Sequence, residues 1–341
     1  MFISTHNMKP SALFSTLSLC LFLFLFLSLP PPSLAARCNP NDKEALLQIK
    51  KSLNNPTHLA AWKPNTNCCN WNGIICNPAT NRVATLQLDS GNLSGQIPPA
   101  VGNLPFLENL FVLNLSNLTG HIPSTVAKLS HLTFLAISHT SISGRIPSFL
   151  SQLKNLTYIN LSYNQLTGSI PASLSQLTQL TAIDLGGNKL TGKIPSSFGE
   201  FTGAVPDLYL SQNKLSGTIP KSMGYLNYSA IYLANNMLEG EVTPLFGKNK
   251  TLRFVHLGSN KFRFDMSKVE LPVTLFLLDL SHNGITGSLP ASFASPNLMN
   301  LNVSYNRLCG QIPAGGNLQV FEPSAYLPNR CLCGAPLPAC K

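Results

Sequence analysis

The segment INLSYNQLTGSIP, residues 159–171, carries the pattern on which most of the chain is built. Its Ile159 and Leu161 alternate, so their side chains lie on one face of a short strand and the residues between and beside them face solvent. Asn164 can turn inward and hydrogen-bond the backbone of the bend, and Gly168 falls in the turn after the strand. One such unit cannot bury its apolar face alone, which predicts that it stacks on copies of itself.

Nine further copies occur between residues 84 and 313. From Gly95 to Gly310, nine steps cover 215 residues, a mean period of about 24 residues, which is typical of leucine-rich repeats. The copies are 86–98, 111–123, 135–147, 183–195, 208–220, 231–242, 255–264, 278–290 and 301–313. We therefore predict an α/β solenoid, a right-handed leucine-rich-repeat superhelix of ten repeats over 84–313 with a concave parallel β-sheet.

An asparagine follows the second apolar residue in seven repeats, at Asn164, Asn188, Asn213, Asn236, Asn260, Asn283 and Asn306. We expect these amides to form a buried ladder between coils, because an unpaired buried amide costs about 1–3 kcal/mol. Gly91, Ser116 and Thr140 stand at this position in the first three repeats. The ladder should be weaker there.

The first 35 residues predict a cleaved secretory signal. Lys9 precedes the apolar run Leu17–Leu29, and the small Ser33 and Ala35 suit a signal peptidase. The run is shorter than the roughly 20 residues that span a bilayer. We expect a secreted, extracellular protein that does not associate with membranes.

After removal of Cys20 with the signal, eight cysteines remain in two clusters, one near each end. In an oxidising compartment this distribution predicts two stapled caps, at 36–83 and 314–341. Three pairings are possible within each cluster, and we favour Cys38–Cys68, Cys69–Cys76, Cys309–Cys331 and Cys333–Cys340. The adjacent Cys68 and Cys69 suit a zinc site poorly, so we expect no metal and no cofactor. In the first cap, Asn41, Asp42 and Glu44 resemble the start of a helix.

The composition argues against an enzyme and against nucleic-acid binding. Only 11% of residues are charged, yet 23 Lys and Arg outnumber 13 Asp and Glu. The basic excess favours an acidic wall polysaccharide over nucleic acid, because no Arg-aromatic stripe accompanies it. Asp184 and Asp279 are four coils apart, about 19 Å at roughly 4.8 Å per strand, too far for the pair of a glycosidase. His139, His256 and His282 are interpreted as polar surface.

The chain carries eight glycosylation sequons, at Asn92, Asn114, Asn117, Asn155, Asn160, Asn227, Asn249 and Asn302. The repeat register places Asn114, Asn160 and Asn302 on the exposed sheet face. A glycan there would obstruct a protein partner, so either these three stay bare or binding uses the remaining strands.

Three segments resemble the polygalacturonase-inhibiting proteins of plant cell walls. They are CNPNDKEALLQIKKSLNNP (38–56), SHTSISGRIP (138–147) and GGNLQVFEPSAYLPNRCLCGAPLPAC (315–340). The resemblance implies a monomer in the cell wall that blocks the substrate cleft of fungal or insect endopolygalacturonases, with acidic pectin as a further partner. The Thr-Gly-x-Ile-Pro segment of the repeat implies a second, short sheet beside the concave one.

Inhibition of this kind would be steric and would use the exposed residues of the concave strands. Tyrosines are the expected anchors. By register, the candidate contacts are Ala136, Ser138, His139, Tyr158, Asn160, Ser162, Asp184, Gly186, Tyr209, Ser211, Tyr232, His256, Asp279 and Tyr305. Asn160 and Gly186 stand at two positions where the family carries acidic residues, while Asp184 lies in the fifth strand.

Two other interpretations remain open. The scaffold also resembles a plant antifreeze protein, but ice binding requires a flat row of Asn, Ser or Thr, and the sequence offers its Asn row only as the buried ladder. The second interpretation is a non-catalytic extracellular module that recognises a peptide or a glycan.

Overall fold

A computed structural model describes residues 37–89 and 91–341. The expected signal segment, residues 1–35, lies outside the described residues. The chain divides into two units, Met1–Arg37 and Cys38–Lys341, and the second holds every element described below. Within the described part, no helix has the length and apolar character needed to cross a bilayer.

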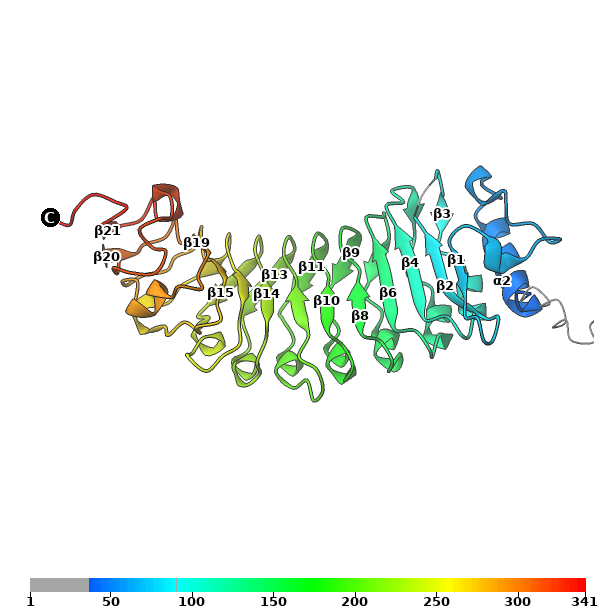
Figure 1. The fold of residues 1–341 in the computed structure, drawn as a ribbon, viewed down its shortest axis with the longest axis horizontal. Helices are drawn as coiled ribbons and strands as arrows, with labels where there is room; N and C mark the ends of the chain where they lie inside the picture. Colours follow the sequence, from blue (N-terminus) through cyan, green and yellow to red (C-terminus); the bar gives the residue numbers. More distant parts are fainter. Residues whose placement is uncertain (1–36, 90) are drawn as a thin grey trace, which may run out of the picture. The chain divides into compact units, whose positions relative to one another are not determined.

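The second unit is a solenoid of ten parallel coils, as predicted (Figure 1). Each coil adds one strand to a large sheet of eleven strands, in which β1 pairs antiparallel with β2 and all other neighbours are parallel. In sheet order the strands are β1 (Ile74–Cys76), β2 (Val83–Leu88), β4 (Asn109–Leu113), β6 (Phe134–Ser138), β8 (Tyr158–Asn160), β10 (Ala182–Asp184), β12 (Asp207–Tyr209), β14 (Ala230–Tyr232), β16 (Phe254–His256), β18 (Leu277–Asp279) and β19 (Asn300–Asn302).

The expected second sheet is present, in two parts. Its six-stranded part comprises β7 (Ser143–Arg145), β9 (Gln165–Gly168), β11 (Lys189–Gly192), β13 (Lys214–Thr218), β15 (Met237–Gly240) and β17 (Lys261–Phe262). A separate pair, β3 (Gly95–Gln96) and β5 (Leu118–Thr119), forms the part of this sheet that belongs to the first two coils.

Short 3₁₀ helices complete the coils, in a row below the strands in Figure 1. They are η3 (Pro99–Asn103), η4 (Ser124–Lys128), η5 (Ser148–Gln152), η6 (Ala172–Gln176), η7 (Ser196–Gly199), η8 (Lys221–Tyr225), η9 (Thr243–Leu245), η10 (Met266–Lys268) and η11 (Ala291–Ala294). The alternating apolar residues of each repeat are buried between these helices and the two sheets, as Ile159 and Leu161 illustrate.

The N-terminal cap covers the first coil with helix α2 (Pro40–Ser52), which begins one residue earlier than expected because Asn39 is its N-cap. Asp42 is buried, and its carboxylate accepts hydrogen bonds from the Arg82 guanidinium at 2.7 and 2.9 Å and from the Val83 N–H at 2.8 Å. The ion pair therefore ties helix α2 to the residue that precedes β2, the first strand of the repeats. Its disulfides are Cys38–Cys68 and Cys69–Cys76, the pairs expected from the sequence.

The asparagine ladder is present from the fourth coil onward. Asn236 is typical: its Nδ2 donates to the carbonyls of Leu210 and Leu233, and its Oδ1 accepts from the Leu215 N–H at 3.0 Å. One side chain thus bonds two coils at once. Thr140 joins the ladder through its hydroxyl, which donates to Asn164 Oδ1. Ser116 is exposed, so the ladder begins at Thr140.

The C-terminal cap is an incomplete eleventh coil. Asn329 extends the ladder, because its Nδ2 donates to the Val303 carbonyl and its Oδ1 accepts from the Leu308 N–H. Strand β21 (Cys331–Cys333) pairs in parallel with β20 (Cys309–Gln311). The Cys309–Cys331 disulfide links this coil to the tenth, and Cys333–Cys340 closes a loop within the cap; both have the expected partners.

Candidate protein-binding face

The side of the large sheet that faces away from the core is here called the sheet face. Its central row is set by strand register, which pairs Asn160 with Asp184, Asp184 with Tyr209, and Tyr232 with His256. In strand order the row reads Phe111, Ala136, Asn160, Asp184, Tyr209, Tyr232, His256, Asp279 and Asn302. Seven of the fourteen expected contact residues therefore share this row. Tyr158 lies beside it, two residues before Asn160 on β8.

Three expected contacts are buried, which corrects the prediction that they are exposed. Ala136, Ser138 and Ser162 each expose 5% or less of their surface. The methyl group of Ala136 lies between the larger Phe111 and Asn160 at the paired positions and does not reach past them. The Ser162 hydroxyl is turned back to donate to Asn160 Oδ1.

Five expected contacts lie beyond the ends of their strands, which is a second correction. Ser162, Gly186 and Ser211 follow β8, β10 and β12 by two residues, and Gly186 and Ser211 are half-buried. His139 and Tyr305 are exposed and follow β6 and β19 by one and three residues, in a row of turn residues with φ between 53° and 58°. This conformation turns the backbone N–H toward the next coil, as when the His139 N–H donates to the Ser162 carbonyl. The non-glycine members of this edge row are Asn114, His139, Tyr163, Gln212, Asn235, Ser259, His282 and Tyr305.

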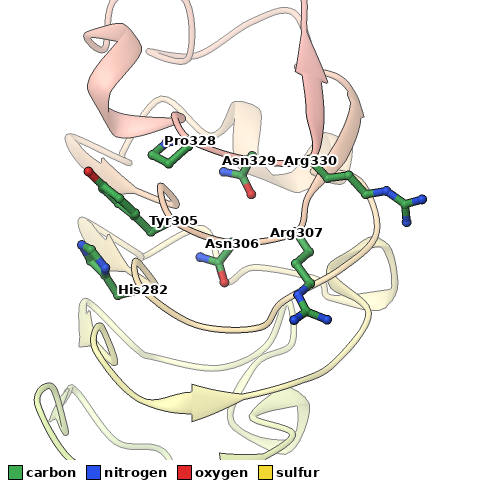
Figure 2. Close-up of a pocket in the computed structure, with 7 residues that line it drawn as sticks. All are labelled: His282, Tyr305, Asn306, Arg307, Pro328, Asn329 and Arg330. Carbon is green, nitrogen blue, oxygen red and sulfur yellow. The ribbon is translucent and has the colours of Figure 1, made fainter.

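Two aromatic stacks lie along the edge row. The rings of His139 and Tyr163 are 4.4 Å apart, and those of His282 and Tyr305 are 3.9 Å apart. Figure 2 shows the second pair side by side, with Arg307 and Arg330 extending away from it. Tyr163 was not among the expected contacts, although it stands one repeat after His139.

A first aromatic cluster on the sheet face joins three consecutive strands. Phe134 stacks on Tyr158 at 4.4 Å between ring centroids and contacts Phe111 at 5.2 Å. The sequence analysis selected only Tyr158. Phe134 occupies the equivalent position on the preceding strand, so the repeat alignment contained the signal that would have found it.

A second cluster, here called the tyrosine cluster, consists of Tyr209, Tyr232 and His256 on β12, β14 and β16, and β10 separates it from the first. Tyr209 stacks on Tyr232 at 4.9 Å, and Tyr232 meets the edge of His256 at 6.0 Å. His256 Nε2 is 2.8 Å from Asp279 Oδ2. Burial raises the pKa of both Tyr209 and Tyr232, so their hydroxyls remain hydrogen-bond donors. All four residues were expected contacts.

The carboxylates of the sheet face differ in their electrostatics. Burial raises the pKa of Asp184 and of Asp207, a residue of the neighbouring strand that the sequence analysis missed. Burial opposes ionisation of Asp279 as well, but hydrogen bonds from His256 and Ser281 outweigh it and lower the pKa of Asp279. Asp184 and Asp279 lie four strands apart, as expected. These carboxylates can accept hydrogen bonds from a docked basic surface.

The three sequons that were expected on the sheet face differ in position and in hydrogen bonding. In Asn160 and Asn302 the Oδ1 accepts from the hydroxyl of the sequon's own serine, Ser162 or Ser304, at 2.7 Å. Asn114 is exposed and lies in the edge row just after β4, not on the strand face as expected. The other five, Asn92, Asn117, Asn155, Asn227 and Asn249, are exposed.

Metal binding finds no support in the cysteine clusters. Among residues 37–89 and 91–341, one group of three candidate ligands brings its atoms within 4.8 Å, and it consists of Cys38, Cys68 and Cys69. All three sulfurs are in disulfides, which removes the thiolates that a metal would need.

Family models agree with this architecture. A leucine-rich-repeat N-terminal domain matches residues 39–77, and leucine-rich repeats match 130–190, 207–226 and 274–296. The fold and its exposed sheet face therefore define a leucine-rich-repeat protein with a surface suited to binding.

The relatives narrow the class to a family. The chain is 62% identical to polygalacturonase inhibitor 1 of Arabidopsis thaliana over 89% of this chain and 93% of the relative. It is 57% identical to the polygalacturonase inhibitor of Vitis vinifera over 98% and 100%. A solved plant ice-binding protein is 46% identical with a TM-score of 0.87, over 89% of this chain and 99% of that chain. The chain belongs to the polygalacturonase-inhibitor family.

Proposed function

We propose that this protein is secreted to the plant cell wall, where it binds endopolygalacturonases of fungal or insect pathogens as a monomer. The sheet face covers the substrate cleft of the enzyme, so inhibition is steric and needs no catalytic group. Ten parallel strands at roughly 4.8 Å give a face about 48 Å long, which suits a standard interface of about 800 Å² per partner.

The observation that carries this proposal is the tyrosine cluster. Tyr209, Tyr232 and His256 stand on three consecutive strands, half-buried and in mutual contact. Contacting rings lose little conformational freedom when a partner covers them, and tyrosines with free hydroxyls are frequent interface hot spots. Asp184 and Asp279 flank the cluster in the central row and supply acceptors for basic groups of the enzyme.

The test is an inhibition assay on a panel of fungal and insect endopolygalacturonases, read out as release of reducing ends from pectin. Tyr209→Ala or Tyr232→Ala should raise the half-inhibiting concentration about 30-fold, the equivalent of a 2 kcal/mol hot spot. Tyr225→Ala is the matched control, because Tyr225 is 84% exposed on η8 and lies on neither sheet. Unchanged reducing-end release across the whole panel with the wild-type protein would refute the proposal.

Binding to acidic pectin is a second candidate function, supported by a basic row along the second sheet and its continuation. The residue after each ladder asparagine is Lys189, Lys214, Lys261, Arg307 or Arg330 in five coils, and each is exposed. None of them takes part in an ion pair with another described residue. Binding of de-esterified pectin should therefore disappear at high salt, and salt-independent binding would contradict this role.

Ice binding is the weaker alternative, favoured by the solved neighbour and by a row of hydroxyls that the sequence analysis did not recognise. The hydroxyls of Thr119, Ser143 and Thr167 each donate to a glycine carbonyl of the preceding coil, at 3.1 to 3.3 Å. Thr191 and Ser216 hold the same repeat position in the next two coils, and Glu239 holds it on β15, but strand register pairs Thr191 with Lys214 and Ser216 with Met237. A thermal-hysteresis assay tests this alternative directly.

A further inference from the structure

A pocket of about 350 Å³ lies where the incomplete eleventh coil meets the last two strands of the sheet face. The Val303 N–H donates to the Ala325 carbonyl at 2.7 Å, just as the Leu280 N–H donates to the Asn302 carbonyl one coil earlier. Ala325 therefore continues the central row into the eleventh coil. Its methyl group fills much less space than the tyrosine, histidine, aspartate or asparagine of earlier coils, which leaves the hollow. We call it the C-terminal pocket.

The lining of the C-terminal pocket combines acidic groups with apolar surface. Asp279 and Glu322 supply carboxylates, and Met299, Phe321 and Leu277 supply apolar surface. No lysine or arginine is among its lining residues, although Lys and Arg outnumber Asp and Glu by 23 to 13 in the chain. The pocket is therefore acidic, whereas the chain as a whole is basic.

The two carboxylates have free capacity to accept hydrogen bonds. Glu322 is exposed, and no hydrogen bond or ion pair joins its carboxylate to another residue in the described ranges. Asp279 accepts from His256 through Oδ2 and from the Ser281 N–H through Oδ1, but a carboxylate offers about four acceptor sites. An anionic occupant would meet two negative groups, whereas a cation would meet two acceptors.

We propose that the C-terminal pocket binds an arginine side chain of the protein that docks on the sheet face. The guanidinium lies against Glu322 and Asp279, where paired N–H groups suit a carboxylate, and the aliphatic stem packs on Met299 and Phe321. The pocket adjoins the tyrosine cluster through the His256–Asp279 pair. The identity of the docked protein rests on the proposed function above, but the preference for a cation does not.

A small probe tests the preference without any enzyme. Protein labelled with ¹³C at the methionine methyl groups is titrated with N-acetyl-arginine methylamide and, separately, with the neutral citrulline analogue. The arginine probe should shift the Met299 signal saturably and the citrulline probe should not. Met237, exposed on β15 outside the pocket, is the internal control, and Met299→Leu assigns the signal.

The titration uses protein whose Asn302 peptide is free of glycan by mass spectrometry, because Asn302 also lines the pocket. Glu322→Gln should weaken the response to arginine about fivefold, since it removes the charge but keeps the size of the side chain. A Met299 signal that does not move, or that moves equally with citrulline, would overturn the cation site.

The second measurement asks whether the docked enzyme uses the pocket. Glu322→Gln should raise the half-inhibiting concentration against endopolygalacturonase about fivefold, while Glu270→Gln, an exposed glutamate on no strand of either sheet, should leave it unchanged. Equal inhibition by Glu322→Gln and wild type would overturn the assignment to the enzyme interface. If the wild type inhibits no enzyme, the proposed function fails, and the probe titration still decides the cation site.

Discussion

The two ends of the solenoid keep their coils together by different means. From Asn164 to Asn329, an asparagine in each coil bonds the backbone of the preceding coil, and Thr140 begins this ladder through its bond to Asn164. The first two coils have no such ladder, and their strands β2 and β4 are six and five residues long, against three in β8. Longer strands make more backbone hydrogen bonds between coils. The contrast teaches that a coil interface can be stabilised by backbone pairing or by a buried amide, provided the polar groups are satisfied.

The largest loss in the free energy of unfolding is expected from a substitution at the N-terminal end of the solenoid, where the first two coils lack the ladder. Asp42→Ala leaves the Arg82 guanidinium and the Val83 N–H without their acceptor. Removing one partner of a buried ion pair costs about 3–5 kcal/mol, and we expect a loss near the lower value because Arg82 is 18% exposed. Guanidinium chloride denaturation measures it. Glu44→Ala, an exposed glutamate on the same helix, is the control, and an equal loss for both variants would contradict the role of the ion pair.

The next effect would break the end that has the ladder. Asn236→Ala removes the donor to Leu210 and Leu233 and the acceptor for the Leu215 N–H. Several buried backbone groups lose their partner, so we expect a loss of about 3 kcal/mol in the free energy of unfolding. The same denaturation experiment applies. A loss below about 0.5 kcal/mol, the usual range for a surface substitution, would show that the ladder is dispensable.

A smaller expected effect is the pH dependence of the unfolding free energy that arises from two aspartates of the sheet face, Asp279 and Asp184. The folded-state pKa of Asp279 is lowered, so its ionised form stabilises the fold above the unfolded pKa of about 3.9, and this is lost as pH falls through the folded pKa. The pKa of Asp184 is raised, so ionising it destabilises the fold as pH rises through the folded pKa. At pH 7, Asp279→Asn should destabilise and Asp184→Asn should stabilise.

Both differences from wild type should shrink at low pH: that of Asp184→Asn as pH falls through the raised pKa of Asp184, and that of Asp279→Asn only below the unfolded value of about 3.9. Unfolding free energies between pH 3 and pH 7 measure them. A difference of the same sign for both variants would show that the sheet face is electrostatically uniform.

The smallest change in the free energy of unfolding is expected in the second coil, at the repeat position that holds the ladder asparagine in later coils. Ser116→Ala changes the second coil at the repeat position that Asn236 occupies in a later coil. Ser116 is exposed, so the free energy of unfolding should change by less than about 0.5 kcal/mol. A loss as large as that of Asn236→Ala would mean that the ladder extends to this coil.

The repeats and the ladder could be predicted because each is a local signal repeated at a fixed period, and the cysteine partners because the eight cysteines form two separate clusters. The contact residues were harder to predict. Register placed seven of them in one row, but the burial of Ala136 and Ser162 depends on the side chains of neighbouring strands. The place of His139 beyond its strand depends on where each short strand ends.

The period of about 24 residues and the stacking of the coils follow from the amino-acid pattern, because a repeated apolar unit can bury its face only against copies of itself. The exposure of each surface side chain follows from the folded chain instead, because it depends on residues about 24 positions away on adjacent coils. It also showed that the C-terminal cap is an eleventh coil. The cap keeps the backbone contacts of the repeat, through Asn329 and Ala325, after most of the repeat's sequence pattern has been lost.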